Sequence, residues 1–499
     1  MLSYKDVSYD THISITIHEI ENRKVDLSFR NNDFDEKELV VADFENERIT
    51  QNTSDITGVI NEIDNEDEMM RIFAIIKLTE LILASPCQVL LHLDPDHYYK
   101  FIQYAQCITT QKYVLKSLCF LFQLITELEI YQQILIDIDF FQFLANTISD
   151  NVENETTILC IYLVIYSLRL HDEIRISILQ NNILEIINNL ESNDDTLNTL
   201  KARFYVEFFS YDFGETTFEL CYNNIYHLQL ISINDTLPNR AKCYGLDGLS
   251  KIAELFPGLS KNIASGSFIF RLSEYIGNPD SSIRIKSVKL LHNCIKDPDF
   301  PLSELIKYNT IDAMLDTFQW SDEKLAEYCI NIFDEIIKRG NSNLLNNSSD
   351  DIDHNPNNSN TNITINDLII KKILEKHLLE SLEPLTFHIK EEIISMILLL
   401  TEGANSQQIE AMFRPEVFSL LIDLINIGIS SLTIVILTIF SNVISKHPNP
   451  EIKILLYQNL INSDVLNNIS TLMHEEKLSE PEINIITHFI QELTPLYTE

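Results

Sequence analysis

The chain has 499 residues, with 74 acidic against 36 basic side chains and a formal net charge of −38 at pH 7. Nucleic acids and anionic membranes carry the same sign of charge, so this balance argues against either as the main partner and favours a protein. The 45% of hydrophobic residues can build a large core, and only 10 Gly and 14 Pro are too few turn-formers for an all-β chain of this length. We therefore expect an all-α protein.

The first 60 residues predict a polar, acidic leader. The alternation Ile13-Ser14-Ile15-Thr16-Ile17 within it is typical of a strand, but it stands alone and leaves the structure of the leader open. The start lacks the pattern of a signal peptide, and no apolar run is long enough to cross a bilayer. Eight cysteines lie singly, as small core residues do in a reducing compartment. We expect a protein of the cytoplasm, with the nucleus as a second location.

A repeat of about 42 residues organises the rest of the chain, residues 61–499. Apolar helical patterns follow polar turns near residues 109, 151, 193, 235, 279 and 321, and further units begin near 385 and 429 before a closing helix at 482–493. Ser and Asp in these turns suit the start of a helix, where a side-chain oxygen accepts backbone NH groups. The period predicts a right-handed α-solenoid of armadillo/HEAT-type repeats.

One segment interrupts the period. Residues 341–366 are rich in Asn, Ser and Asp and cannot bury enough apolar surface to fold, so we expect a disordered insertion between two helices of one repeat.

The sequence carries no catalytic constellation. It has no phosphate-binding glycine motif, no His-Glu-x-x-His and no Gly-x-Ser-x-Gly, and its histidines lack a second His or Cys one turn away. We therefore expect a protein that is not an enzyme and that holds no metal or other cofactor.

The long helix of each armadillo-like unit lines the concave face of a solenoid, so its side chains one turn apart are candidates for contact with a partner. In the unit near residue 321 this register gives Ile332 and Ile336. Because no single chemistry repeats along the array, the mixed surface suits one folded partner better than a regular extended peptide. The candidate partner-binding residues are Tyr162, Tyr166, Arg203, Glu207, Lys289 and Asn293.

Two solenoid families resemble parts of the chain. The segment Thr433–Val443 resembles the last repeats of importin-α, whose groove helices carry a Trp and, one turn later, an Asn. Here Asn293 and Asn442 match the Asn, whereas Lys289 stands where the family has Trp and would repel a basic peptide. The alternative function that this resemblance implies is a divergent adaptor that binds basic extended segments of cargo for nuclear import.

Residues 80–215 resemble the fungal assembly chaperones of the 26S proteasome base, a HEAT-repeat family that also carries a mismatch-repair name. The likeness rests on Asn151–Asn154 before a long helix, on Glu173–Asn182 running into Leu184, and on Arg203–Phe209. It implies a cytosolic chaperone whose concave face holds the C-terminal domain of a AAA ATPase subunit of the regulatory particle. The resemblance identifies no individual binding residue.

Overall fold

The computed structural model describes most of the chain between residues 56 and 493. The ranges are 56–122, 129–150, 154–190, 192, 194–317, 322–339, 365–375, 386–413, 415–427, 429–449, 451–463, 465–475 and 478–493. Within them every regular element is a helix and none is a strand. The predicted leader lies almost wholly, and the predicted insertion mostly, outside the described residues, and the first helix within the described ranges begins at Ile56, inside the predicted leader.

The chain folds into two compact units. The first comprises the chain up to Cys221 together with Asn234–Gly248, and the second comprises Tyr222–Ile233 together with Leu249–Glu499. Two long helices, α14 (Thr217–Ile233) and α15 (Asn239–Leu255), are each divided between the units.

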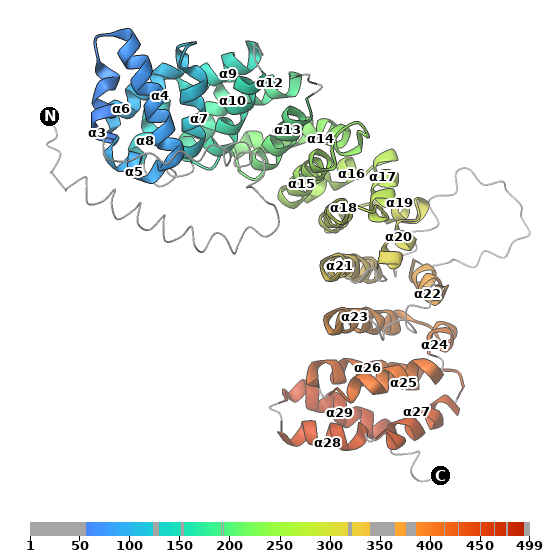
Figure 1. Cartoon of the computed structure of the whole chain (residues 1–499). Coiled ribbons are helices and arrows are strands. Elements are labelled where there is room, and N and C mark those ends of the chain that lie inside the picture. Colours follow the sequence, from blue (N-terminus) through green and yellow to red (C-terminus); the bar gives the residue numbers. More distant parts are fainter. Residues whose placement is uncertain are drawn as a thin grey trace, which may run out of the picture. The chain divides into compact units, whose positions relative to one another are not determined.

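In the first unit, four long helices form a ladder in which α4, α7, α10 and α13 each pack on the next, and shorter helices cover one side of it (Figure 1). The helices are α3 (Ile56–Asn61), η1 (Glu62–Asp64), α4 (Glu68–Ala84), α5 (Pro86–His92), α6 (Pro95–Gln103), η2 (Tyr104–Gln106), α7 (Gln111–Leu121), α8 (Glu129–Asp137), α9 (Phe140–Asp150), α10 (Asn154–Ser167), α11 (Asp172–Gln180), α12 (Ile183–Asn189), α13 (Asp195–Phe208) and η4 (Gly214–Thr216).

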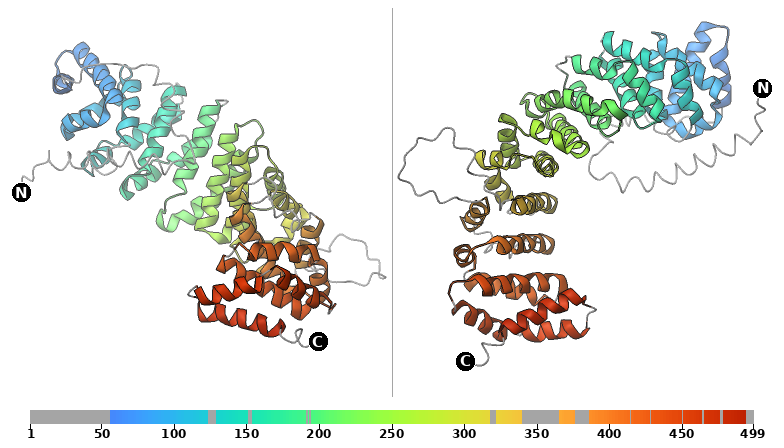
Figure 2. Two further views of the ribbon diagram at one scale, coloured as in Figure 1. Left: turned by 60° about the horizontal axis from the view of Figure 1, so that its bottom comes forward. Right: turned by 180° about the vertical axis from the view of Figure 1, so that it is seen from behind.

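The second unit repeats this design. Its ladder consists of α18, α21, α23, α26 and α29, and a second row of helices runs beside it (Figure 2). The helices are η5 (Pro257–Leu259), α16 (Ser260–Ile263), α17 (Ser267–Ile276), α18 (Ser281–Ile295), α19 (Leu302–Lys307), α20 (Thr310–Thr317), α21 (Glu323–Arg339), α22 (Ile365–Glu375), α23 (Phe387–Gly403), α24 (Ser406–Met412), α25 (Pro415–Ile425), α26 (Ser430–Lys446), α27 (Glu451–Asn462), α28 (Val465–Glu475) and α29 (Glu480–Leu493).

The long helices begin at the predicted period. Their first residues are 111, 154, 195, 239, 281 and 323, so successive starts lie 41 to 44 residues apart. The predicted units near 385 and 429 begin their long helices at Phe387 and Ser430, and the closing helix is Glu480–Leu493. The predicted all-α solenoid with a repeat of about 42 residues is confirmed.

Local chemistry fixes these starts. Before α18 the Asn278 side chain accepts the NH of Asp280, and the Asp280 carboxylate in turn accepts the NH of Ser282, each at 2.9 Å. Arg284, one turn into the helix, donates from Nη1 to the carbonyls of Asn278 and Pro279 at 2.8 and 3.0 Å. The same three-residue arrangement precedes and opens α4, where it is made by Asn65, Asp67 and Arg71. A turn closed in this way provides acceptors for the unpaired NH groups at the start of a helix. Its polar residues also mark the start of the helix in the sequence.

Candidate partner-binding surface

The first two candidate residues stack on one another in α10. The rings of Tyr162 and Tyr166 lie 6.1 Å apart between centroids with 17° between their planes, and both side chains are almost fully buried. Burial raises the pKa of the Tyr162 hydroxyl to about 12, and the positive charge of Arg203 opposes that rise. The hydroxyl therefore stays protonated at neutral pH and can act as a hydrogen-bond donor.

The next two candidates lie on α13, the neighbouring long helix of the same unit. Arg203 is half-buried, and its positive charge acts to lower the pKa of the Tyr162 hydroxyl. The Glu207 carboxylate accepts from Arg169, which follows α10, with 2.6 Å between Nη2 and Oε1. A second ion pair, Lys112 to Glu155 at 2.5 Å, joins α7 to α10. Tyr162, Tyr166, Arg203 and Glu207 therefore form one group, part of which already ties adjacent helices together.

The last two candidates lie in the second unit, on α18. Lys289 is half-buried, whereas Asn293 is buried and its amide Nδ2 donates to the Oγ of Ser250 at 2.8 Å and to the Ser250 carbonyl at 3.3 Å. Asn293 thus connects α18 to the last turns of α15 within the same unit. The contact of all six residues with a partner stays a prediction, but the structure gives Asn293 a bond inside the stack. The placement of Ile332 and Ile336 on the open face was wrong, because α21 buries both in the core.

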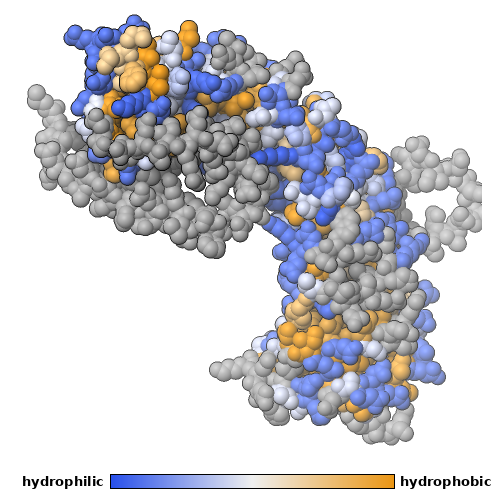
Figure 3. Space-filling view, viewed as in Figure 1, coloured by the Kyte–Doolittle hydropathy of each residue, from blue (hydrophilic) through white to orange (hydrophobic). Residues whose placement is uncertain are grey.

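Sequence reasoning missed a group of exposed apolar side chains on the first two long helices. Met69 and Phe73 lie one turn apart on α4, and Tyr113 lies on α7, which packs along α4; all three are exposed. We call these three residues the α4–α7 patch. Figure 3 shows apolar side chains reaching the surface over this N-terminal part of the unit. The sequence did contain a signal for this group. Helix α4 has more apolar residues than the row Ile75, Leu78 and Ile82 that enters the core, and the additional ones have to lie on another side of the helix.

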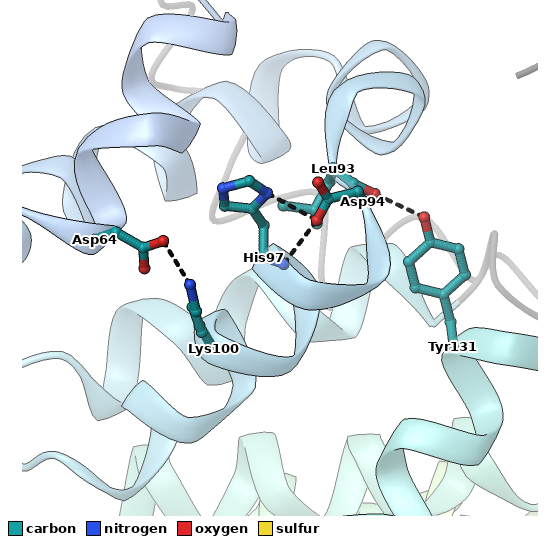
Figure 4. A network of polar contacts seen from close by, with 6 residues as sticks. All are labelled: Asp64, Leu93, Asp94, His97, Lys100 and Tyr131. Atoms are coloured by element: carbon teal, nitrogen blue, oxygen red, sulfur yellow. Dashed lines mark hydrogen bonds and ion pairs between the residues drawn. The ribbon is translucent and has the colours of Figure 1, made fainter.

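A cluster of polar side chains in the first unit caps helix α6 and connects it to its neighbours (Figure 4). Asp94 caps α6 by accepting from the NH of His97 at 2.9 Å, and its Oδ1 also lies 2.7 Å from Nδ1 of that ring. Lys100 pairs with Asp64 at 2.5 Å, and the Tyr131 hydroxyl donates to the carbonyl of Leu93 at 2.6 Å. Over the described ranges, no group of His, Cys, Asp and Glu side chains could hold a metal ion. Nor is any helix there long and apolar enough to cross a membrane.

No protein-family model matches the sequence, and neither does any curated protein. Solved structures do match. An engineered protein shares 12% identity at a TM-score of 0.63, over 88% of this chain and 98% of its own. A structure from a study of a phosphorylation switch between cadherin and beta-catenin shares 12% identity at a TM-score of 0.55, over 88% of this chain and 86% of its own. A designed armadillo-repeat protein with a (KR)4 peptide matches 48% of this chain and 99% of its own, at 9% identity and a TM-score of 0.42. The first two likenesses show the fold. It is an all-α solenoid of the armadillo type.

Proposed function

We propose that this chain is a non-enzymatic assembly chaperone of the 26S proteasome base that binds the C-terminal domain of a AAA ATPase subunit. The partner comes from the sequence resemblance over residues 80–215. The binding mode comes from the surface of the first unit, which is the observation that carries the proposal. There the α4–α7 patch is exposed on the first two long helices of the ladder, and the half-buried charged side chains of Arg203 and Glu207 lie on α13 of the same ladder.

A surface of this composition suits a folded domain. Exposed aromatic and methionine side chains are enriched where proteins bind each other, because they supply large contact areas and adapt to the partner. The charged residues beside them would set orientation and selectivity rather than supply most of the affinity. A ladder for an extended peptide would instead repeat one chemistry from helix to helix.

The test is calorimetric titration of the full-length chain with purified C-terminal domains of the proteasomal ATPase subunits. We expect one domain to bind with one-to-one stoichiometry. The double change Phe73→Ser, Tyr113→Ser should weaken binding about tenfold or more, because truncating a buried aromatic anchor typically costs over 1 kcal/mol. The matched control is Ile454→Ser, Ile461→Ser, which removes two exposed apolar side chains from α27 in the second unit and should leave the affinity unchanged.

Two results would count against the proposal. If no ATPase domain binds, the proposed partner is wrong. If the control variant loses as much affinity as the Phe73→Ser, Tyr113→Ser variant, the proposed binding surface is wrong. Binding of unrelated basic peptides with a steep dependence on salt would instead favour the import adaptor, since a chain of net charge −38 attracts cations at long range.

A further inference from the structure

The α4–α7 patch has positive charge beside its exposed apolar side chains. Met69 and Phe73 are 73% and 62% exposed, and Tyr113 is 42% exposed. Lys77 lies one turn beyond Phe73 on α4, and Lys116 lies one turn beyond Tyr113 on α7; both lysines are half-buried. Each exposed aromatic ring of the patch therefore has a lysine on the same side of its helix.

The charge of these two helices differs in sign from the charge of the chain. Helices α4 and α7 together carry four basic and two acidic side chains, whereas the whole chain carries 36 and 74. One of the four, Lys112, pairs with Glu155 of α10, and a positive excess still remains with that carboxylate included. The patch therefore suits an occupant that is both apolar and acidic.

The N-terminal part of the same chain contains a segment of this composition. Residues 1–55 lie outside the part of the chain that the structure describes. Within them, residues 33–47 hold seven acidic side chains and one basic side chain, whereas the other forty residues hold six and five. Phe34 and Phe44 each stand between two acidic residues. We call residues 33–47 the acidic segment.

The acidic segment is joined to the chain close to the patch. The first described helix, α3, begins at Ile56 and packs on α4 (Figure 1). Residues 48–55 can span about 30 Å when extended, whereas α4, with 17 residues, is about 25 Å long. The segment can therefore reach the whole length of α4.

This short connection favours the segment over a free partner. An occupant tethered by a few polar residues has an effective concentration on the order of 1 mM. An intrinsic dissociation constant of about 0.1 mM would then keep the patch covered for about nine-tenths of the time. A second molecule at micromolar concentration would need a much tighter contact to achieve the same cover.

We propose that the acidic segment docks on the α4–α7 patch of its own chain, with its phenylalanines against Met69, Phe73 and Tyr113 and its carboxylates beside the two lysines. The thioether and aromatic side chains supply apolar contact, and the lysines select an acidic occupant. The docked segment would compete with the ATPase domain for this surface. That competition rests on the proposed function, whereas the docking itself does not.

Hydroxyl-radical footprinting of the full-length chain, without any partner, tests the docking. Met69 reports the cover directly, because oxidation of its thioether requires access. We expect Met69 to be oxidised at least about threefold faster in the variant Phe34→Ser, Phe44→Ser than in the unchanged chain, because the segment would leave the patch. Lys77→Glu should also speed the oxidation of Met69, since it places a negative charge beside the carboxylates of the segment.

The matched control is Ile13→Ser, Ile15→Ser. It removes two apolar side chains from the nearly neutral part of residues 1–55 and should leave the oxidation of Met69 unchanged. Tyr226, which is 65% exposed on α14, should be labelled equally in every variant and so calibrates the dose. Equal oxidation of Met69 in the unchanged chain and in Phe34→Ser, Phe44→Ser would overturn the docking, as would an equal gain in the control. Protection that grows between two protein concentrations about tenfold apart would assign the cover to a second copy instead.

Calorimetry distinguishes failure of the docking from failure of the proposed function. An ATPase domain should bind the variant Phe34→Ser, Phe44→Ser about three to ten times more tightly than the unchanged chain, because a larger fraction of molecules has an open patch. If no ATPase domain binds while Met69 is released in the variant, the partner is wrong and the docking stands. If a domain binds both chains equally, the segment does not compete for this surface.

Discussion

Asn293→Ala is expected to weaken the second unit without removing a partner contact. Asn293 was a candidate binding residue on its spacing alone, but its amide is buried and donates to both the Oγ and the carbonyl of Ser250. Alanine removes both hydrogen bonds, together with the one that Asn293 Oδ1 accepts from Lys296 Nζ at 3.3 Å, and leaves the Ser250 groups, which are themselves buried, without the Asn293 donor. The substitution therefore tests whether the side chain serves the stack or a partner.

The magnitude follows from the burial of both partners. Leaving a buried polar group unsatisfied costs about 1 to 3 kcal/mol, so we expect a loss of about 2 kcal/mol in the free energy of unfolding of the second unit. Asn442 on α26 makes a comparable bond, from Nδ2 to the Oγ1 of Thr401 at 3.1 Å, but it is half-buried and makes one such bond instead of two. Asn442→Ala should therefore cost less, about 0.5 to 1.5 kcal/mol.

Hydrogen exchange followed by mass spectrometry is the assay, because a chain of two units is not expected to unfold in one step. Peptides from the ends of α15 and α18 should lose protection in Asn293→Ala, while peptides from α4 and α7 should not change. The affinity for an identified partner should stay within twofold wherever the unit remains folded. Unchanged protection together with a large loss of binding would refute this reasoning and return Asn293 to the binding surface.

Three further changes have defined outcomes. Burial, followed by the charge of Lys296, lowers the pKa of His292 to about 4, so the unfolded chain binds more protons than the folded chain between about pH 4 and 6.5 and stability is lost as pH falls through that window. His292→Gln should remove this contribution, so the slope of unfolding free energy against pH, measured by urea titration, should be less positive in the variant than in the unchanged chain; an unchanged slope would show that His292 is not responsible. Asp334 contributes with the opposite sign in an overlapping window, because burial raises its pKa to about 6 and its contribution to stability falls as pH rises from about 4 to about 6; Asp334→Asn should therefore make the slope more positive than in the unchanged chain in the same titrations. Among the seven cysteines whose burial the structure describes, Cys107 should react first with iodoacetamide, because it alone is not buried and a hydrogen bond with Thr109 lowers the pKa of its thiol. Mass mapping checks the order, and faster labelling of a buried thiol such as Cys294 would contradict it.

The repeat could be predicted because its signals are local. A long helix starts where an Asp side chain accepts backbone NH groups, as Asp280 does before α18, and the polar residues around it mark the turn in the sequence. The same holds for Asp194, which accepts the NH groups of Thr196 and Leu197 before α13. These contacts span two or three residues, so reading the chain in order suffices to place them.

The surface could not be predicted in the same way, because it depends on which sides of a helix are covered. A long helix of a solenoid has a neighbour before it, a neighbour after it and shorter helices behind it. Ile332 and Ile336 have the spacing of an open face but lie in the core, and Asn293 is polar but bonded to Ser250 on the preceding long helix, α15. A small rotation of a helix about its axis decides whether such a side chain is buried or exposed. That rotation is set by packing against residues about 42 positions away in the sequence, so the local sequence does not reveal it.

The residues that do remain open share a feature that spacing alone does not reveal. Phe73 on α4 and Tyr226 on α14 are large and apolar, and each lies on a helix that already has another apolar side in the core. Exposing such side chains in a monomer gains nothing for folding and favours aggregation, whereas covering them with a partner contributes the largest share of interface affinity. A second apolar side on a helix is therefore a better guide to binding in this solenoid than polar residues at groove spacing. Its consequence is that the surface proposed for the ATPase domain should lose affinity when an exposed aromatic such as Phe73 is truncated, and much less when a half-buried charge such as Lys289 is replaced.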